Sequence, residues 1–245
     1  MNNICITAEG LSKSFTILKR KITVLQVLLS LINRNSLKQT LWVLKDMSCV
    51  IKKGDRLALL GRNGSGKTTF LRILTSIYDA TAGTFKVNGN ARILFDSSVG
   101  FNAYISVIDN IYLLGAIHGI KRDVLKNEVQ NILETTGLVT YQHALLKKLS
   151  MGQIQRLALS ILFRSKSDLF IFDEALDAVD GDFIKTFDDH LKQLPVGDTT
   201  IIMTSHDSAF LRKYCTTAIW LEDGKNRMHG PFDEVNTAYE RSFNT

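Results

Sequence analysis

Cysteine is scarce in this chain, and its few copies form no motif. The 245 residues include three cysteines, Cys5, Cys49 and Cys215, and no CxxC pair. An odd and scattered set argues against a disulfide framework and is typical of reduced thiols in the cytosol.

The chain also lacks a targeting segment and a long apolar run. The first residues, MNNICITAEG, contain no basic region followed by an apolar stretch, so no signal peptide is predicted. The longest nearly apolar run, residues 22–32, is shorter than the roughly 20 residues of a spanning helix. We therefore expect a protein that is soluble by itself. Its 45% hydrophobic content allows one α/β domain over residues 1–245 with an inserted subdomain.

Acidic residues are absent between Gly10 and Lys45, whereas seven basic residues lie there: Lys13, Lys19, Arg20, Lys21, Arg34, Lys38 and Lys45. Without these seven charges the net charge of +6 becomes −1, so the basic character is local. We therefore predict no nucleic-acid partner. Residues 16–41 interrupt the strand pattern as a basic and apolar insertion. They are predicted either to form a helix that lies at a membrane interface or to be covered by the domain itself.

One stretch fits the phosphate-loop pattern GxxxxGK[ST]. Its nine residues are Gly61, Arg62, Asn63, Gly64, Ser65, Gly66, Lys67, Thr68 and Thr69. A buried strand (RLALL, residues 56–60) precedes the stretch and an amphipathic helix (residues 69–78) follows it, which is the context that the motif requires. A chance glycine-rich turn is the alternative.

The fixed positions of this loop each have a chemical task. Glycines let successive N–H groups point at phosphate oxygens, and the helix N-terminus adds partial positive charge. Lys67 is predicted to reach the β- and γ-phosphates, and the Thr68 hydroxyl to ligate Mg²⁺. The sequence therefore predicts binding of a nucleoside triphosphate.

A second element of such a site is LFIFDE, a buried strand that ends in two carboxylates, Asp173 and Glu174. Asp173 is predicted to hold Mg²⁺ directly or through water, and Glu174 to polarise the attacking water. A polar strand end without a function is the alternative, but it does not explain the presence of the loop.

Strands that alternate with helices around a phosphate loop predict a parallel sheet flanked by helices. Residues 41–55 are predicted as two short strands with a turn at Lys53-Gly54, and residues 82–95 as a hairpin around Asn88-Gly89-Asn90. Residues 96–164 are predicted as an inserted helical subdomain, with one helix ending at Gly137. The tail is predicted as a helix, two strands and a short final helix.

Two further stretches are each only weak evidence for a functional site when considered alone. LSMGQ (residues 149–153) precedes a helix predicted to start near Ile154, so its amides and the Ser150 hydroxyl would form an anion site. His206 follows the strand TTIIMTS, where a neutral imidazole could bind a γ-phosphate, although a lone histidine there is more often structural.

The order of these four motifs, GRNGSGKT, LSMGQ, LFIFDE and His206, resembles the nucleotide-binding subunits of ABC transporters over nearly the whole chain. The resemblance implies a RecA-like P-loop core with a flanking antiparallel β-subdomain. It also implies an ATPase that forms a homodimer, in which two chains sandwich two ATP molecules. Ser150, Gly152 and Gln153 would contact the ATP of the other chain, with Met151 departing from the family's LSGGQ.

By the same resemblance Phe15 would stack on adenine, and Asp180 would contact the partner chain. The loop that enters the helical subdomain usually contains a glutamine, but no glutamine lies between Ala91 and Asn110. Asp96, Ser97 or Ser98, or the loop backbone, would then couple ATP to the permease. For Asp96, a turn-capping role is an equal alternative.

ILFDSSVGFNAYISVIDNIY, DEALDAVDGDF, the early insertion and the tail IWLEDGKNRMHGPFDEV resemble the branch that exports O-antigen, capsule or teichoic acid chains. This implies a peripheral protein on the cytoplasmic face of the cell membrane, a permease partner and a lipid-linked polysaccharide. Residues 16–41 would then face the permease or the bilayer. Some members carry a C-terminal carbohydrate-binding domain, and we expect none within these residues. The alternatives are another export system, a non-transport ABC ATPase acting on ribosomes or DNA, and a nucleotide-binding regulator without turnover. The intact Glu174 and His206 argue against the last.

Overall fold

The computed structural model describes residues 3–18, 38–94, 100–174, 181–194 and 197–243. Its strands are β1 (Ile4–Leu18), β2 (Lys38–Lys52), β3 (Arg56–Leu60), β4 (Ala82–Val87), β5 (Ala91–Leu94), β6 (Leu169–Asp173), β7 (Thr200–Thr204), β8 (Thr217–Glu222) and β9 (Lys225–Pro231). Its helices are α2 (Lys67–Leu74), α3 (Val107–Ile117), α4 (Arg122–Thr136), α5 (Met151–Leu162), α6 (Gly181–Gln193), α7 (Ser208–Tyr214) and α8 (Phe232–Arg241), with short 3₁₀ turns at Val139–Tyr141 and Leu146–Lys148.

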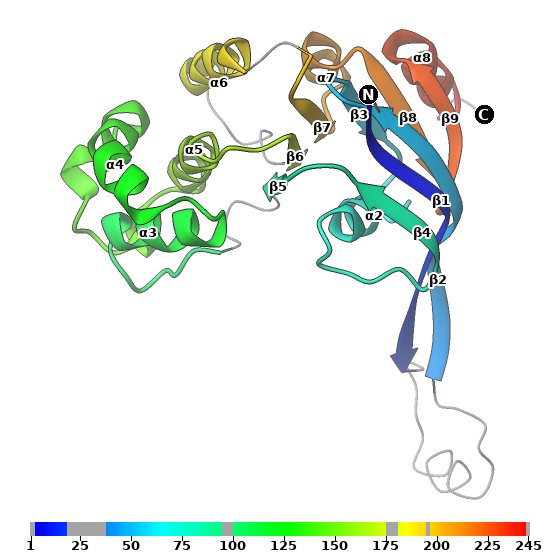
Figure 1. The fold of residues 1–245 in the computed structure, drawn as a ribbon, viewed down its shortest axis with the longest axis horizontal. Coiled ribbons are helices and arrows are strands. Elements are labelled where there is room, and N and C mark those ends of the chain that lie inside the picture. The colour runs from blue at the N-terminus through cyan, green and yellow to red at the C-terminus, as the bar shows by residue number, and fades with distance from the viewer. Residues whose placement is uncertain (1–2, 19–37, 95–99, 175–180, 195–196, 244–245) are drawn as a thin grey trace, which may run out of the picture.

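The larger sheet has six strands in the order β5-β6-β7-β3-β8-β9 (Figure 1). All neighbouring pairs are parallel except β8 and β9, which are antiparallel. Because β6, β7 and β3 are adjacent and parallel, their carboxyl ends lie along one edge of the sheet. The predicted parallel sheet flanked by helices is thus confirmed, and this edge receives the polar residues that follow each strand.

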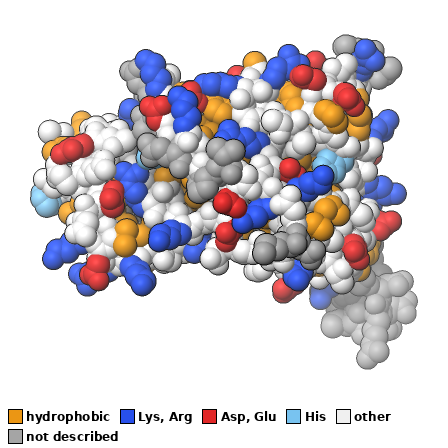
Figure 2. All heavy atoms as spheres, turned by 45° about the horizontal axis from the view of Figure 1, so that its top comes forward, with side chains coloured by type: hydrophobic (Ala, Val, Ile, Leu, Met, Phe, Trp, Pro, Cys, Tyr) orange, Lys and Arg blue, Asp and Glu red, His pale blue; other side chains and the backbone are white. Residues whose placement is uncertain are grey.

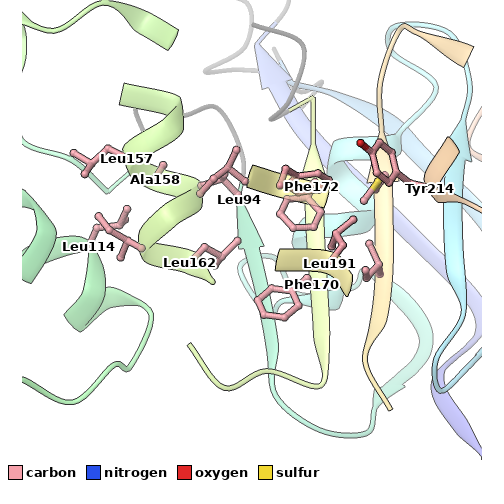
Figure 3. Packing of buried hydrophobic residues seen from close by; sticks show 14 of the residues in the cluster. Leu94, Leu114, Leu157, Ala158, Leu162, Phe170, Phe172, Leu191 and Tyr214 are labelled. Atoms are coloured by element: carbon pink, nitrogen blue, oxygen red, sulfur yellow. The ribbon is translucent and has the colours of Figure 1, made fainter. Parts of the chain in front are cut away.

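The two faces of this sheet belong to different hydrophobic clusters. Phe170 and Phe172 of β6 face a cluster built from α3–α8, whereas Leu169 and Ile171 face α2 and the smaller sheet. This alternation follows from the two-residue period of a strand. Figure 3 shows Leu157, Ala158 and Leu162 of α5 on the helical side of the first cluster, near Leu94 of β5. The helical segment is therefore anchored directly on the sheet.

The smaller sheet is antiparallel, with the order β2-β1-β4. The predicted hairpin over residues 82–95 is wrong, because β4 pairs with β1 whereas β5 pairs in parallel with β6 in the other sheet. The prediction of two short strands in residues 41–55 is also wrong, since β2 runs unbroken to Lys52, but the predicted turn at Lys53-Gly54 is present. Asp46 has a φ of 56° and the β1–β2 register shifts nearby, so a bulge explains the interrupted pattern.

The ends of the predicted insertion at residues 16–41 are strand. β1 continues to Leu18 and β2 starts at Lys38, and their paired ends extend beyond the body of the molecule (Figure 1). Residues 19–37 lie outside the described residues, and so does the predicted interface helix within them. The loop candidates Asp96, Ser97 and Ser98 lie outside them as well.

Helix boundaries follow local backbone rules. α4 ends at Thr136 with Gly137 in the left-handed conformation, as predicted. The helix predicted to continue to residue 78 ends at Leu74, because Ser76 has a φ of 57° that turns the chain back. The helix predicted near Ile154 starts at Met151, because Ser150 forms its N-cap. Among the described residues, no helix has the length and apolar character required to cross a membrane.

Candidate functional site

The phosphate loop connects β3 to α2, and its backbone is held tightly against neighbouring strands. Gly66 stands at the N-cap of α2 with a φ of 107°. A Cβ atom there would lie 2.8 Å from Leu44 Cδ2 and 3.0 Å from the Val43 carbonyl oxygen. Because a glycine has no side chain to cap the helix, the first N–H groups of α2 remain available for an anion.

Lys67 and Ser65 are two polar residues of this loop. The Lys67 ammonium donates a hydrogen bond of 2.7 Å to the Gly61 carbonyl oxygen. Burial lowers the pKa of Lys67 below its ordinary value, and the carboxylates of Glu174 and Asp173 partly oppose that effect. The Ser65 Oγ is buried and has no hydrogen-bond partner among the described residues. A buried hydroxyl without a partner beside a desolvated ammonium is the environment that a bound phosphate oxygen would satisfy.

Asp173 and Glu174 end β6, and Thr204 on the neighbouring strand β7 holds both. The Thr204 hydroxyl donates to Asp173 Oδ1 at 2.7 Å, and both groups are buried. The Glu174 amide donates to Thr204 Oγ1 at 2.9 Å and to its carbonyl oxygen at 3.2 Å. Glu174 has a φ of 55°, a conformation that a residue with a side chain adopts at a cost of roughly 1–3 kcal/mol. These hydrogen bonds hold the strained backbone at the site.

His206 lies directly opposite Glu174. Its Nε2 is 3.2 Å from Glu174 Oε1, and the two side chains are 62% and 45% exposed. His206 and Lys67 also line one cleft of about 360 Å³. The structure thus brings the loop together with Asp173, Glu174 and His206, which lie more than a hundred residues further along the chain.

This arrangement fits a nucleotide with a magnesium ion. Thr68 is exposed at the start of α2, and Asp173 is the buried carboxylate at the end of β6. Within the described part of the chain, no group of three or more His, Cys, Asp or Glu side chains could hold a metal ion. Magnesium in phosphate sites is commonly held by one or two protein oxygens together with phosphate oxygens and waters. Thr68 and Asp173 fit that pattern.

Comparison with known families identifies the chain. The family described as ABC transporter matches residues 44–177, which include the phosphate loop, LSMGQ and Glu174. The chain belongs to the ABC transporter family. The resemblance to ABC transporter subunits that the motifs predicted is thereby confirmed, and so is the predicted α/β fold class with a P-loop core.

Relatives with assigned names share about three residues in ten with this ABC chain. It is 29% identical over 241 residues to the teichoic acids export ATP-binding protein TagH of Lactococcus lactis, covering 98% of this chain and 51% of that protein. It is 28% identical over 242 residues to TagH of Staphylococcus saprophyticus, covering 99% and 90%. It is 29% identical over 199 residues to the O-antigen export system ATP-binding protein RfbB of Myxococcus xanthus, covering 81% and 46%. The chain therefore spans about half the length of two of these relatives.

Solved structures agree on the fold. The dimeric post-hydrolysis state of the ATP-binding cassette MJ0796 with ADP and Pi aligns with a TM-score of 0.72 at 17% identity, covering 93% of this chain and 98% of that one. The ATP-binding subunit of an ABC transporter aligns with a TM-score of 0.74 at 18% identity, covering 96% and 93%. At these identities the likeness supports the cassette fold alone.

The LSMGQ residues lie apart from the cleft. Ser150 caps α5, accepting from the Gln153 amide at 3.3 Å, and its own amide donates to Gln153 Oε1 at 2.9 Å. Neither these two residues nor Gly152 line the cleft that contains Lys67. Figure 1 shows α5 on the helical side of the sheet, away from α2. This ABC chain therefore presents its signature and its phosphate loop as two separate surfaces.

Two other predicted residues fall outside the cleft. Phe15 is half-buried on β1, and its ring packs against Tyr78 with a centroid distance of 5.5 Å. Asp180 lies outside the described residues. The roles assigned to these two residues stay predictions.

Sequence reasoning missed the C-terminal wall of the cleft. Arg62 of the phosphate loop donates to the Ser242 carbonyl oxygen at 3.3 Å and stacks over the Phe243 ring at 4.7 Å. Tyr239 packs edge-to-face on Phe243, and both rings line the cleft. The sequence offers no signal for these contacts, because about 180 residues separate Arg62 from Ser242. Thr204 was also missed, although it lies in the strand TTIIMTS only two residues before the predicted His206.

Proposed function

We propose that this chain is the ATP-binding and ATP-hydrolysing subunit of an ABC transporter that powers export of a surface polysaccharide of the teichoic acid, O-antigen or capsule type. Glu174 beside His206 and Lys67, at the carboxyl edge of the sheet, is the observation that carries the ATPase part of the proposal. The export part is supported by the names of the relatives, which concern teichoic acid and O-antigen export.

Each residue of the site has a role in this proposal. The loop amides and Lys67 would bind the β- and γ-phosphates, and Thr68 and Asp173 would hold Mg²⁺. When bound, Mg²⁺ would neutralise charge that develops on the phosphate oxygens. The Glu174 carboxylate would accept a proton from the attacking water, and His206 Nε2 would hold the carboxylate in place until the His206 side chain turns to the γ-phosphate.

The second half of the ATP site would come from another copy of this chain. Ser150, Gly152 and Gln153 lie on a separate surface, so a homodimer would place them on the nucleotide held by the partner's loop. The amides at the start of α5 would then meet the phosphates. A permease in the cytoplasmic membrane would be the other partner, with a lipid-linked polysaccharide as its cargo and this chain peripheral on the cytoplasmic face.

We propose no nucleic-acid partner. On the face shown in Figure 2, Lys and Arg side chains are interspersed with Asp and Glu side chains. Such a mixture lacks the single-sign field that attracts a phosphate backbone.

The test replaces Glu174 with Gln, which keeps the shape of the side chain and removes the base. We expect ATP binding to remain and ATPase activity to fall by about 10²–10⁴. Cells that carry only this variant should lose their surface glycopolymer, and the wild-type chain should copurify with an integral-membrane permease.

The outcomes separate the parts of the proposal. Near-normal ATPase activity would contradict the role of Glu174. Loss of ATPase activity with unchanged surface glycopolymer would assign the chain to another export system. Copurification with ribosomes or DNA and no permease would assign it to a non-transport ABC ATPase.

A further inference from the structure

An aromatic pair joins the smaller sheet to the segment that follows the phosphate-loop helix. Phe15 of β1 and Tyr78 meet edge to face, with an interplanar angle of 73°. The Lys13 ammonium lies 5.2 Å from the Phe15 ring centroid and 5.6 Å from that of Tyr78. It also donates to the Asp79 carbonyl oxygen at 2.7 Å. The orientation of the Phe15 ring is therefore set by neighbours from both segments.

Tyr78 is in turn fixed to the phosphate-loop helix by one residue. Arg72, in the last turn of α2, donates from Nη1 to the Tyr78 hydroxyl at 2.9 Å. The Tyr78 amide donates to the Arg72 carbonyl oxygen at 3.1 Å. The left-handed turn at Ser76 folds the chain back so that both contacts form. Side chain and backbone thus tie Tyr78 to α2.

The pair stands at a suitable distance from the phosphate loop. Phe15 pairs with Leu41 of β2, and Leu44 of the same strand abuts Gly66 of the loop. Three residues of strand span roughly 10 Å. That length is comparable with the distance from the base to the phosphates of an extended nucleotide. α2 starts at the phosphate loop, and the segment that follows its last residue, Leu74, contains Tyr78. The helix therefore connects the loop with the aromatic pair.

We propose that Arg72 and Tyr78 are positioning residues that hold Phe15 in the orientation that stacks on the nucleotide base. The proposal rests on the ATP binding proposed above and on the predicted role of Phe15, which the family resemblance implies stacks on adenine. A ring that is already ordered loses less conformational freedom when a base stacks on it. The contacts of Arg72 and Tyr78, which we call the brace, therefore strengthen binding of the base and leave binding of the phosphates unchanged.

The experiment compares two ligands, ATP and inorganic tripolyphosphate, which shares the phosphates and lacks the base. Dissociation constants are measured by calorimetry in EDTA, which prevents turnover. Tyr78→Phe removes the hydroxyl and keeps the ring. We expect its dissociation constant for ATP to rise about three- to tenfold, since the lost hydrogen bond joins a charged donor, with that for tripolyphosphate unchanged. Tyr78→Leu, which also removes the ring contact, should raise the ATP value further.

The matched control is Tyr141→Phe, which removes a hydroxyl from a tyrosine that is 40% exposed in the helical segment. It should alter neither dissociation constant. Equal weakening of both ligands by Tyr78→Phe would mean that Tyr78 only supports the fold, and the proposal would be wrong. Unchanged ATP binding in Tyr78→Phe and Tyr78→Leu would also overturn it.

Phe15→Ala separates this proposal from the one on which it rests. If Phe15→Ala weakens ATP selectively and Tyr78→Phe does not, Phe15 binds the base and the brace is refuted alone. If Phe15→Ala leaves both ligands unchanged, stacking on Phe15 is refuted together with the brace. The ATPase assignment, which depends on Lys67 and Glu174, would stand in either case.

Discussion

Thr204 is a residue whose hydroxyl should contribute both to the stability of this site and to its catalytic rate. Its buried hydroxyl donates to Asp173 Oδ1 at 2.7 Å and accepts from the Glu174 amide at 2.9 Å. Thr204→Val keeps the shape and removes both bonds. A hydrogen bond to a charged group contributes about 1.5–3 kcal/mol and a neutral one about 0.5–1.5 kcal/mol. The added methyl group offsets about 0.8 kcal/mol, so we expect the free energy of unfolding to fall by about 2–3 kcal/mol.

The assay is urea and thermal unfolding followed by circular dichroism. For a chain of this length, the loss corresponds to a decrease in Tm of about 5–10 °C. The rate of ATP hydrolysis should fall as well, by about tenfold or more, because Glu174 loses a bond that holds its strained backbone. ATP binding at the loop should change little, since Thr204 does not line the cleft.

Two control variants sharpen the test. Thr204→Ser retains the hydroxyl and should keep the hydrolysis rate. Thr136→Val removes an equally buried hydroxyl that donates to the Ile132 carbonyl oxygen of its own helix, and it should leave ATP hydrolysis unchanged. If Thr204→Val matches the wild type in stability and rate, the reasoning about this hydrogen-bond pair is wrong.

Three other predictions concern the rest of the chain. Mixing a Lys67→Ala chain with a Ser150→Arg chain should partly restore ATPase activity, because one composite site then has two intact halves; activity that follows monomer at dilutions too low for dimers would contradict this. Burial, with a smaller effect of Arg92, lowers the pKa of His118 from 6.5 to about 4, so the unfolded chain binds more protons in that interval. The free energy of unfolding should therefore fall by about 3 kcal/mol as the pH drops from 6.5 to 4, and pH titration of His118→Leu should lack this part of the slope. Burial also raises the pKa of Cys49 and Cys215 to about 12 and that of Cys5 above its ordinary value, so iodoacetamide at pH 8 should label the three thiols only after unfolding; rapid labelling of the native chain would refute their burial.

The local sequence pattern was sufficient to predict an element where the element's own residues determine its bounds. β3 was predicted with its observed bounds, and the end of α4 at Gly137 followed from a left-handed cap. The local pattern was not sufficient where the structure depends on which strand pairs with which. Residues 82–95 alternate like a hairpin, but alternation does not specify the partner, and β4 and β5 join different sheets.

The residues of the candidate site likewise fall into those that could be predicted from the sequence and those that could not. Motif residues such as Lys67 and Glu174 were readable because their chemistry requires particular side chains at fixed spacing. Thr204 and Phe243 were not readable, because their contacts depend on which strands and helices become neighbours. Met151, the departure from the family's signature, is 56% exposed at the start of α5.

Strand order explains why the candidate catalytic and nucleotide-binding residues lie along one edge of the sheet. β6 and β7 pair so that Asp173 faces Thr204, and β7 pairs with β3, which leads into the loop. Three parallel strands that end together place a carboxylate, an imidazole and a phosphate loop side by side, although each comes from a different part of the chain. The same topology sends α5, with Ser150 at its start, to the helical side of the sheet. A chain that folds in this way is expected to complete its ATP site with a second copy, because its own signature and loop lie on separate surfaces.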